Sequence, residues 1–287
     1  LSITKNRLEG APSEKLLEEV EAAIELAKNP ESRDLVLEGR LRMERGLAKV
    51  ECGNLEEARD DLTWAETRLK SVAKASRDHD ISMLNKAAFH VLVDEPLMAL
   101  HVYSEIPRKG QHVPETIAFS RYGAAQICAH LGQYEAALRH SWVSYSLAFE
   151  SNLEDLVWDA GTTFLAIGAE SISSEAKSMN EQVENAKPRD VDEEVPDAEV
   201  REEEYILVFD KCLGIFDGNL GGSTRQDLMG ILSGAIALGR DDLIFELFTE
   251  PEKIEDAFLI AALMQLSPED DRAKWQERLT SLVNVSD

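Results

Sequence analysis

Residues 132–137 read Gly132-Gln133-Tyr134-Glu135-Ala136-Ala137, and two earlier stretches follow a similar pattern that ends in a small alanine. They are Gly53-Asn54-Leu55-Glu56-Glu57-Ala58 and Asp94-Glu95-Pro96-Leu97-Met98-Ala99. The three stretches begin 41 and then 38 residues apart. A regular interval of this size between similar stretches is typical of a repeated supersecondary unit.

Each stretch predicts the tight turn of a helical hairpin. A glycine can take the left-handed conformation that ends a helix, and the alanine five residues later lets the second helix approach the first closely. In the middle unit Asp94 stands in place of the glycine, and Pro96 begins the second helix, where proline is well tolerated. After the first turn, apolar residues recur at the three- and four-residue steps of an amphipathic helix: Leu55, Ala58, Leu62, Ala65, Leu69 and Val72.

The segment from Leu131 to Leu138 resembles the inter-helix turn of the tetratricopeptide repeat family, with its following tyrosine and alanine. Gly46, Ala87 and Ala125 match the family's small residue in the first helix of each unit. The resemblance covers roughly residues 33–150. Its interval departs from the family's standard 34 residues and is similar to the repeats of about forty residues in bacterial signalling regulators and kinesin light chains. The resemblance implies an all-α fold, a right-handed superhelical solenoid of antiparallel helix pairs.

We expect residues 1–179 to form this repeat region, with Ser13 as the N-cap of its first helix. The apolar pattern of residues 153–174 predicts the first helix of a fourth unit, and its second helix is expected to run from Glu175 towards Glu184. Residues 180–204 are rich in acids and almost free of apolar side chains, so they predict a flexible acidic linker. The alternative is an acidic strip that pairs with a basic partner.

Residues 205–287 resume helical periodicity and predict two further helical hairpins, which either continue the solenoid or stand apart from it. Apolar faces recur within five segments: 205–216, 228–238, 243–248, 254–266 and 275–283. Ser223 and Gln226 fit a capping box at the start of one helix.

The chain has 55 acidic and 30 basic residues and a formal net charge of -25. A field of this sign repels nucleic-acid phosphates and anionic lipids, so neither nucleic acid nor a membrane is an expected partner. An acidic surface does suit a basic partner protein. The longest nearly unbroken apolar run, Ala257 to Leu266, is half the length that spans a bilayer, and the first residues show no signal pattern. A cytoplasmic location is therefore expected.

No motif indicates catalysis, a cofactor or a metal. The histidines at 79, 90, 101 and 112 are eleven residues apart, whereas metal ligands on one helix need steps of three or four. The glycine-rich stretch 218–224 lacks the lysine of a phosphate-binding loop. Cys52, Cys128 and Cys212 form no CxxC pair and are expected to be buried free thiols.

If the hairpins stack, their first helices line a groove, and alignment on the turns identifies the side chains that point into it. This predicted groove consists of Met43, Leu47, Leu84, Asn85, Ala88, Phe119, Tyr122 and Gln126. Each of them can also be read as ordinary packing between helices. Co-chaperone members of the family that the chain resembles bind acidic peptide tails with a clamp of basic and asparagine side chains at such places. Here Asn85 fits, but Met43 and Gly123 stand at the basic positions, so such a clamp is not expected.

The sequence thus favours a scaffold or sensor module that binds a peptide or helix of another protein in this groove. Two alternatives stay open. One is an enzyme with an unrecognised helical active site, and the other is an acidic decoy for a basic nucleic-acid-binding protein.

Overall fold

A computed structural model describes residues 12–31, 33–107, 111–169, 200–216, 223–240, 243, 244, 246, 248 and 251–284. Every regular element in these ranges is a helix, so the predicted all-α class is confirmed. The chain forms two compact units, Leu1–Ile127 (unit 1) and Cys128–Asp287 (unit 2). The division falls within α7, Pro114–His130, and not in the segment predicted as a linker.

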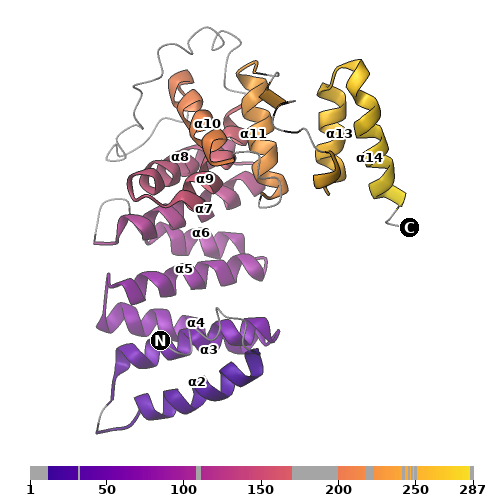
Figure 1. Cartoon of the computed structure of the whole chain (residues 1–287). Helices are drawn as coiled ribbons and strands as arrows, with labels where there is room; N and C mark the ends of the chain where they lie inside the picture. The colour runs from indigo at the N-terminus through magenta and orange to yellow at the C-terminus, as the bar shows by residue number, and fades with distance from the viewer. Residues whose placement is uncertain are drawn as a thin grey trace. The chain divides into compact units, whose positions relative to one another are not determined.

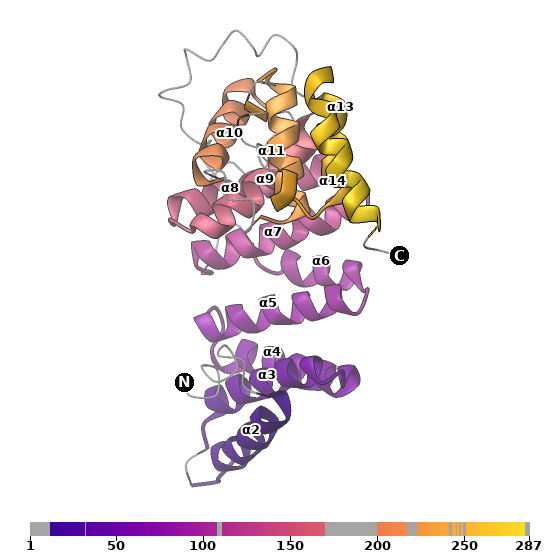
Figure 2. The ribbon, with the colours of Figure 1, turned by 45° about the vertical axis from the view of Figure 1, so that its right-hand side comes forward.

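Unit 1 is a series of helices in which neighbours in sequence pack against each other (Figures 1 and 2). They are α2 Ser13–Ala27, α3 Leu35–Glu51, α4 Leu55–Val72, α5 Arg77–Leu92, α6 Pro96–Ser104 and the first part of α7. The first helices of successive pairs also meet, because α3 contacts α5 directly.

The predicted turns are confirmed. Gly53 and Gly132 have φ values of 77° and 71°, and Asp94 takes the same left-handed conformation at 58°. In each turn the next residue donates its N–H to a carbonyl in the last turn of the preceding helix, as Asn54 does to Lys49 at 2.8 Å. This bond is the one that closes a helix with a left-handed residue after it.

Small residues allow the helix pairs to approach closely, as predicted. Ala58, Ala99 and Ala137 are completely buried. A Cβ atom on Gly46 would lie 2.9 Å from the side chain of Leu62 and 3.3 Å from the carbonyl oxygen of Ala58. The α3–α4 contact therefore depends on glycine at this position.

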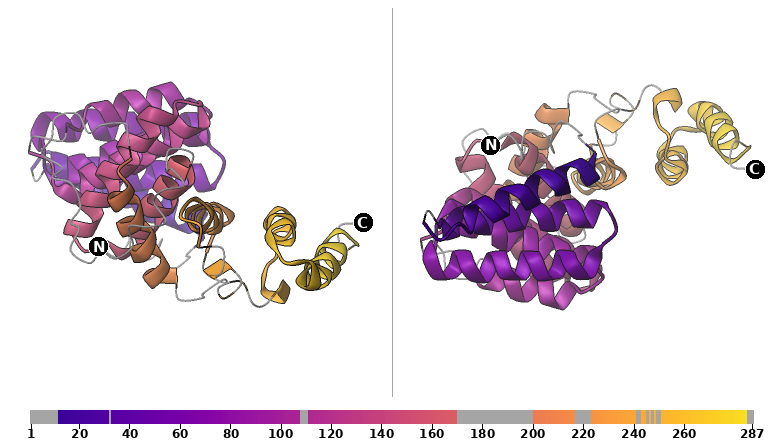
Figure 3. Two further views of the ribbon diagram at one scale, coloured as in Figure 1. Left: turned by 90° about the horizontal axis from the view of Figure 1, so that it is seen from above. Right: turned by 90° about the horizontal axis from the view of Figure 1, so that it is seen from below.

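Unit 2 contains α8 Tyr134–Glu150, α9 Glu154–Gly168, α10 Glu202–Phe216, α11 Arg225–Ala237, α13 Ala257–Leu266 and α14 Arg272–Asn284, with short 3₁₀ turns at Pro251–Lys253 and Glu269–Asp271. Helix α9 lies at the centre, because α8, α10 and α11 all pack against it. The hydroxyl of Tyr205 in α10 donates to the carbonyl of Leu165 in α9 at 2.7 Å. Helices α13 and α14 lie side by side as a hairpin (Figures 1 and 3).

Two predicted helix caps are wrong. Helix α2 has Pro12 at its N-cap position, and the hydroxyl of Ser13 instead donates to Glu51 of α3 at 2.6 Å. The capping box of α11 is formed by Thr224 and Asp227, one residue later than the predicted pair Ser223 and Gln226. Asp227 is the stronger choice because its charge favours the N-terminus of a helix.

The other segment predictions fall partly outside the described residues. Helix α9 confirms the helix predicted within residues 153–174 as far as Gly168, but the expected second helix from Glu175 to Glu184 lies outside the described ranges. Of the predicted acidic linker, residues 180–199 also lie outside them, while its last three residues belong to α10. Among the described residues no helix is long and apolar enough to cross a membrane.

Candidate functional site

The eight predicted groove residues lie on α3, α5 and α7, which are the first helices of their pairs. Met43 belongs to the packed core, since it is only 6% exposed and clusters with Ala58, Leu62 and Phe89. Leu47 is half-buried against the same cluster. Both predicted groove residues of α3 therefore contribute to the packing between helices.

Helix α5 is different, because most of its accessible side chains are apolar. Ile81, Leu84, Ala88 and Val91 recur at helical spacing on one side, and Leu92 adjoins them at the end. Val91 is 48% exposed and Leu92 59% exposed. Below, these five residues are called the α5 apolar face, and the predicted Asn85 lies at its margin.

Helix α7 exposes Phe119, at 47%, and Gln126, with Tyr122 half-buried between them. The amide of Gln126 donates to the hydroxyl of Tyr122 at 2.6 Å. Gly123 sits against α6, where an added Cβ would lie 2.3 Å from the hydroxyl of Tyr103. This close approach fixes the side of α7 that carries Phe119 and Tyr122.

The opposite side of α5 is held in place by buried polar groups. Ser76 caps the helix by accepting the N–H of His79. Glu66 of α4 lies 3.8 Å from Nε2 of His79 and accepts a hydrogen bond from Lys86 at 3.2 Å. The attraction of His79, Lys86 and Lys70 outweighs burial and lowers the pKa of Glu66 to about 2.

Asp80 and His112 add a second polar contact at the start of α5. Nδ1 of His112, which precedes α7, lies 2.6 Å from Oδ1 of the fully buried Asp80. The rings of His79 and His112 are 6.3 Å apart, so the structure does bring two of the evenly spaced histidines together. Nevertheless, no group of three or more potential metal ligands occurs in the described part of the chain.

A similar ion cluster joins α3 to α4. Arg45 donates two hydrogen bonds to Asp61, at 2.8 and 2.6 Å, and Nζ of Lys49 lies 3.0 Å from the same carboxylate. Burial tends to raise the pKa of Asp61, but these two cations reverse the effect and lower it. This cluster fixes α4 against α3, and Glu66 of α4 in turn contacts α5, which carries the candidate surface.

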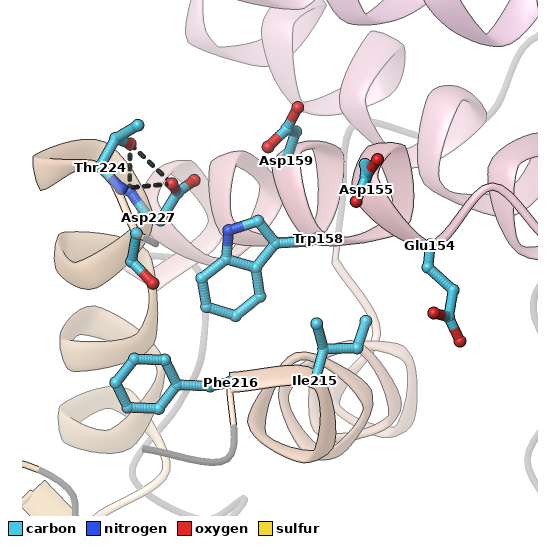
Figure 4. Close-up of a pocket in the computed structure, with 9 residues that line it drawn as sticks. Glu154, Asp155, Trp158, Asp159, Ile215, Phe216, Thr224 and Asp227 are labelled. Carbon is cyan, nitrogen blue, oxygen red and sulfur yellow. Dashed lines mark hydrogen bonds between the residues drawn. The ribbon is translucent and has the colours of Figure 1, made fainter. Parts of the chain in front are cut away.

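Unit 2 contains a cavity of about 380 Å³ that the sequence did not indicate (Figure 4). Below it is called the acidic pocket, and its lining comes from α9, the end of α10 and the start of α11: Glu154, Asp155, Trp158, Asp159, Ile215, Phe216, Ser223, Thr224 and Asp227. The rings of Trp158 and Phe216 lie nearly parallel, 5.9 Å apart. The pocket thus combines carboxylates with an aromatic wall.

Two of its carboxylates have contrasting environments. Asp227 is nearly buried and accepts hydrogen bonds from the N–H and hydroxyl of Thr224 and from the hydroxyl of Thr162. Asp159 forms no side-chain hydrogen bond or ion pair with any described residue. Burial, together with repulsion by Asp227 and Asp155, raises the pKa of Asp159 to about 6.

Only a weak pattern in the sequence points to this pocket. Asp155 and Asp159 lie one helical turn apart with Trp158 beside them, but in so acidic a chain such spacing is common. Asp227 is far away in sequence and reaches the pocket only because α11 packs on α9.

Comparison of the chain with models of protein families, with curated proteins and with solved structures yields no significant match.

Proposed function

We propose that the chain is a tetratricopeptide-like interaction protein that binds an amphipathic helix of a partner protein along the first helices of unit 1. In this proposal it acts as a scaffold or sensor, by binding and not by catalysis. The α5 apolar face and the exposed side of α7 form the binding surface.

The observation that supports the proposal most strongly is the contrast between α4 and α5. Between its terminal residues, α4 exposes only polar side chains: Glu56, Glu57, Asp60, Thr63, Thr67, Lys70 and Ser71. This is the normal pattern for a helix facing water. Between its own terminal residues, the neighbouring α5 exposes Ala88 and Val91, which are both apolar, and most of its core contacts are made by the opposite side. A row of accessible aliphatic residues is typical of a surface that a partner covers.

The shape and charge of the surface favour a particular occupant. Its apolar residues follow one side of a helix, and an amphipathic helix buries such a row with residues at three- and four-residue steps. Because the chain carries a net charge of -25, a partner helix with basic residues beside its apolar side is favoured.

The wider architecture in this proposal is a right-handed superhelical solenoid. It is supported by the recurrent turn geometry, which also occurs at Asn152 and Gly239 with φ values of 55° and 63°. The three cysteines are free thiols, with Cys128 and Cys212 buried and Cys52 half-buried. Free thiols are usual in reducing compartments, which supports the cytoplasm as the proposed location.

The test is selection of peptides from a phage-displayed library on the full chain, followed by titration of synthetic peptides. We expect the selected peptides to be helical on binding, with apolar residues at helical spacing and a positive charge. Ala88→Arg places a long charged side chain in the centre of the α5 apolar face. It should abolish peptide binding without lowering the thermal midpoint, because Ala88 is exposed.

Leu26→Arg is the matched control, since Leu26 on α2 is 74% exposed and lies outside the proposed surface. Peptide affinity should be unchanged in this variant. Binding that tolerates Ala88→Arg would contradict the proposal. If wild-type chains instead self-associate in sedimentation and Ala88→Arg alone becomes monomeric, the occupant is a second copy and not a partner helix.

A further inference from the structure

We infer that the acidic pocket of unit 2 binds a basic side chain, arginine or lysine, presented by a peptide segment of a partner protein. This site goes beyond the proposed function, because it lies in a different unit from the α5 apolar face and has different chemistry.

The negative charge of the acidic pocket is not neutralised by the described residues. Within the described ranges, the side chains of Glu154, Asp155 and Asp159 form no ion pair and no hydrogen bond. The nearby Arg225 is engaged by Asp256 of the following segment. Nζ of Lys211 lies 5.7 Å from the ring centre of Phe149 and borders a neighbouring cavity together with Glu154 and Asp155.

Helix stability explains some of these acids but not all. Glu154 and Asp155 occupy the first turn of α9, where negative charge is favoured, and Asp227 caps α11. Asp159 lies in the second turn and has no such role. Its position beside two other carboxylates is unfavourable unless a cation enters the pocket.

Trp158 also lines the cavity, and its side chain is only 9% exposed. Its indole N–H donates no hydrogen bond to any group in the described part of the chain. Figure 4 shows the nitrogen edge of this ring turned toward Thr224 and Asp227. This donor lines the cavity without an acceptor from the described residues, so a peptide carbonyl that enters the pocket can accept its hydrogen bond.

The ligand that suits both features is a basic residue within a peptide. Its charge compensates the carboxylates, and its backbone carbonyl can accept the hydrogen bond of the indole N–H. Arginine and lysine side chains are also attracted to the faces of aromatic rings, tryptophan above all. A bare metal ion leaves the indole donor unpaired, and the described residues contain no cluster that could hold one. The cavity volume lies near the lower end of the range for small-ligand sites, which suits a single side chain.

The electrostatics add a pH dependence. A bound cation stabilises the ionised form of Asp159, so affinity should rise as the pH increases through about 6. The charged groups around Asp159 are Glu154 and Asp155 on its own helix, Asp227 on α11 and, at the neighbouring cavity, Lys211 on α10.

The test uses the full chain and three acetylated, amidated tripeptides: Gly-Arg-Gly, Gly-Lys-Gly and Gly-citrulline-Gly. Citrulline has the shape of arginine without its charge. The readout is the indole N–H signal of Trp158 in ¹H–¹⁵N NMR spectra, assigned with Trp158→Phe. The other three tryptophans, Trp64, Trp142 and Trp275, serve as internal references.

We expect the arginine or lysine peptide to shift the Trp158 signal saturably, while the citrulline peptide does not. Asp159→Asn should weaken binding roughly ten- to hundredfold, the usual effect of losing one charge-assisted contact. Asp60→Asn removes the same charge from an exposed site on α4 and should leave affinity unchanged.

Three results would overturn the inference. The first is an equal response to the arginine and citrulline peptides, and the second is unchanged affinity in Asp159→Asn. The third is a response to calcium chloride that displaces the peptide, because this would make the pocket a metal site. Asp159→Asn is expected to fold at least as stably as the wild type, so lost binding in this variant cannot be attributed to unfolding.

Discussion

Gly230 of α11 provides a sharp test of how unit 2 is built. A Cβ atom at this position would lie 2.3 Å from the carbonyl oxygen of Thr162 in α9, and 2.8 Å from its carbonyl carbon. Both are backbone atoms, so no rotation of a side chain can relieve the contact. We therefore expect Gly230→Ala to force α11 and α9 apart by about 1 Å.

The expected loss of stability follows from two opposing effects. Overfilling a packed contact typically costs about 1–3 kcal/mol. Replacing glycine by alanine within a helix returns up to about 1 kcal/mol. The net destabilisation should be about 1–2 kcal/mol, which lowers the unfolding midpoint of a unit of this size by roughly 2–8 °C.

Gly214→Ala is the control, because this glycine lies in α10 and a Cβ atom there would meet no neighbour within 4 Å. It should raise stability by about 0.5–1 kcal/mol. Urea unfolding followed by tryptophan fluorescence is a suitable assay, since three of the four tryptophans belong to unit 2. If Gly230→Ala is as stable as Gly214→Ala, the close packing of α11 on α9 is wrong. The acidic pocket would then lose its basis, because Asp227 reaches it through this contact.

Three further predictions concern individual side chains. Tyr122→Ala should weaken the binding of a selected helical peptide by about 1–2 kcal/mol and change the thermal midpoint of the protein little. Unchanged affinity with a much lower midpoint would assign Tyr122 to the core. Because the pKa of Glu66 is lowered from 4.5 to about 2, its stabilising effect is complete above pH 4.5 and is lost as the pH falls towards 2. The free energy of unfolding, measured with urea, should therefore decline across this window by about 2 kcal/mol more in the wild type than in Glu66→Gln, after discounting for solvent screening. The pKa of Asp159 is raised from 3.8 to about 6, so its effect has the opposite sign and stability should fall as the pH rises from about 4 to 6. Asp159→Asn should remove this decline and add on the order of 1 kcal/mol at pH 7, allowing for solvent screening; equal midpoints at pH 4 and pH 7 in the wild type would argue against it.

The fold was predictable where one residue dictates local geometry. Gly53 and Gly132 mark turns because glycine reaches positive φ without strain, and Ala58 marks a close helix contact because it is small. The turns at Asp94 and Asn152 use residues that tolerate the same conformation but also occur in many other settings. The turn at Asp94 was predicted only because the residues after it resemble the other two stretches. The turn at Asn152 was not predicted.

The candidate surfaces show a similar limit. The register of the turns correctly placed Ala88 and Phe119 on accessible sides of first helices, because helical periodicity propagates from a known turn. It could not show that Met43 is buried, since burial depends on how tightly α3 meets its neighbours. The acidic pocket could not be predicted from the sequence, because it forms only where α11 packs against α9. Their close contact depends on Gly230, which looks like any other helical glycine in the sequence.

The α5 apolar face and the acidic pocket have one physical property in common, which is that each contains positions where a different side chain would leave the core intact. Polar residues at Ala88 or Leu92 would leave the packed side of α5 intact, and asparagine at position 159 would remove a repulsion. Stability and solubility alone would therefore favour different residues at these positions. Sites at which local rules are broken while the rest of a fold obeys them are where function is expected. The stability of the variants Ala88→Arg and Asp159→Asn is therefore as informative as their affinity for peptides. If either variant proves clearly less stable than the wild type, the residue concerned has a structural role, and the functional argument for its surface fails.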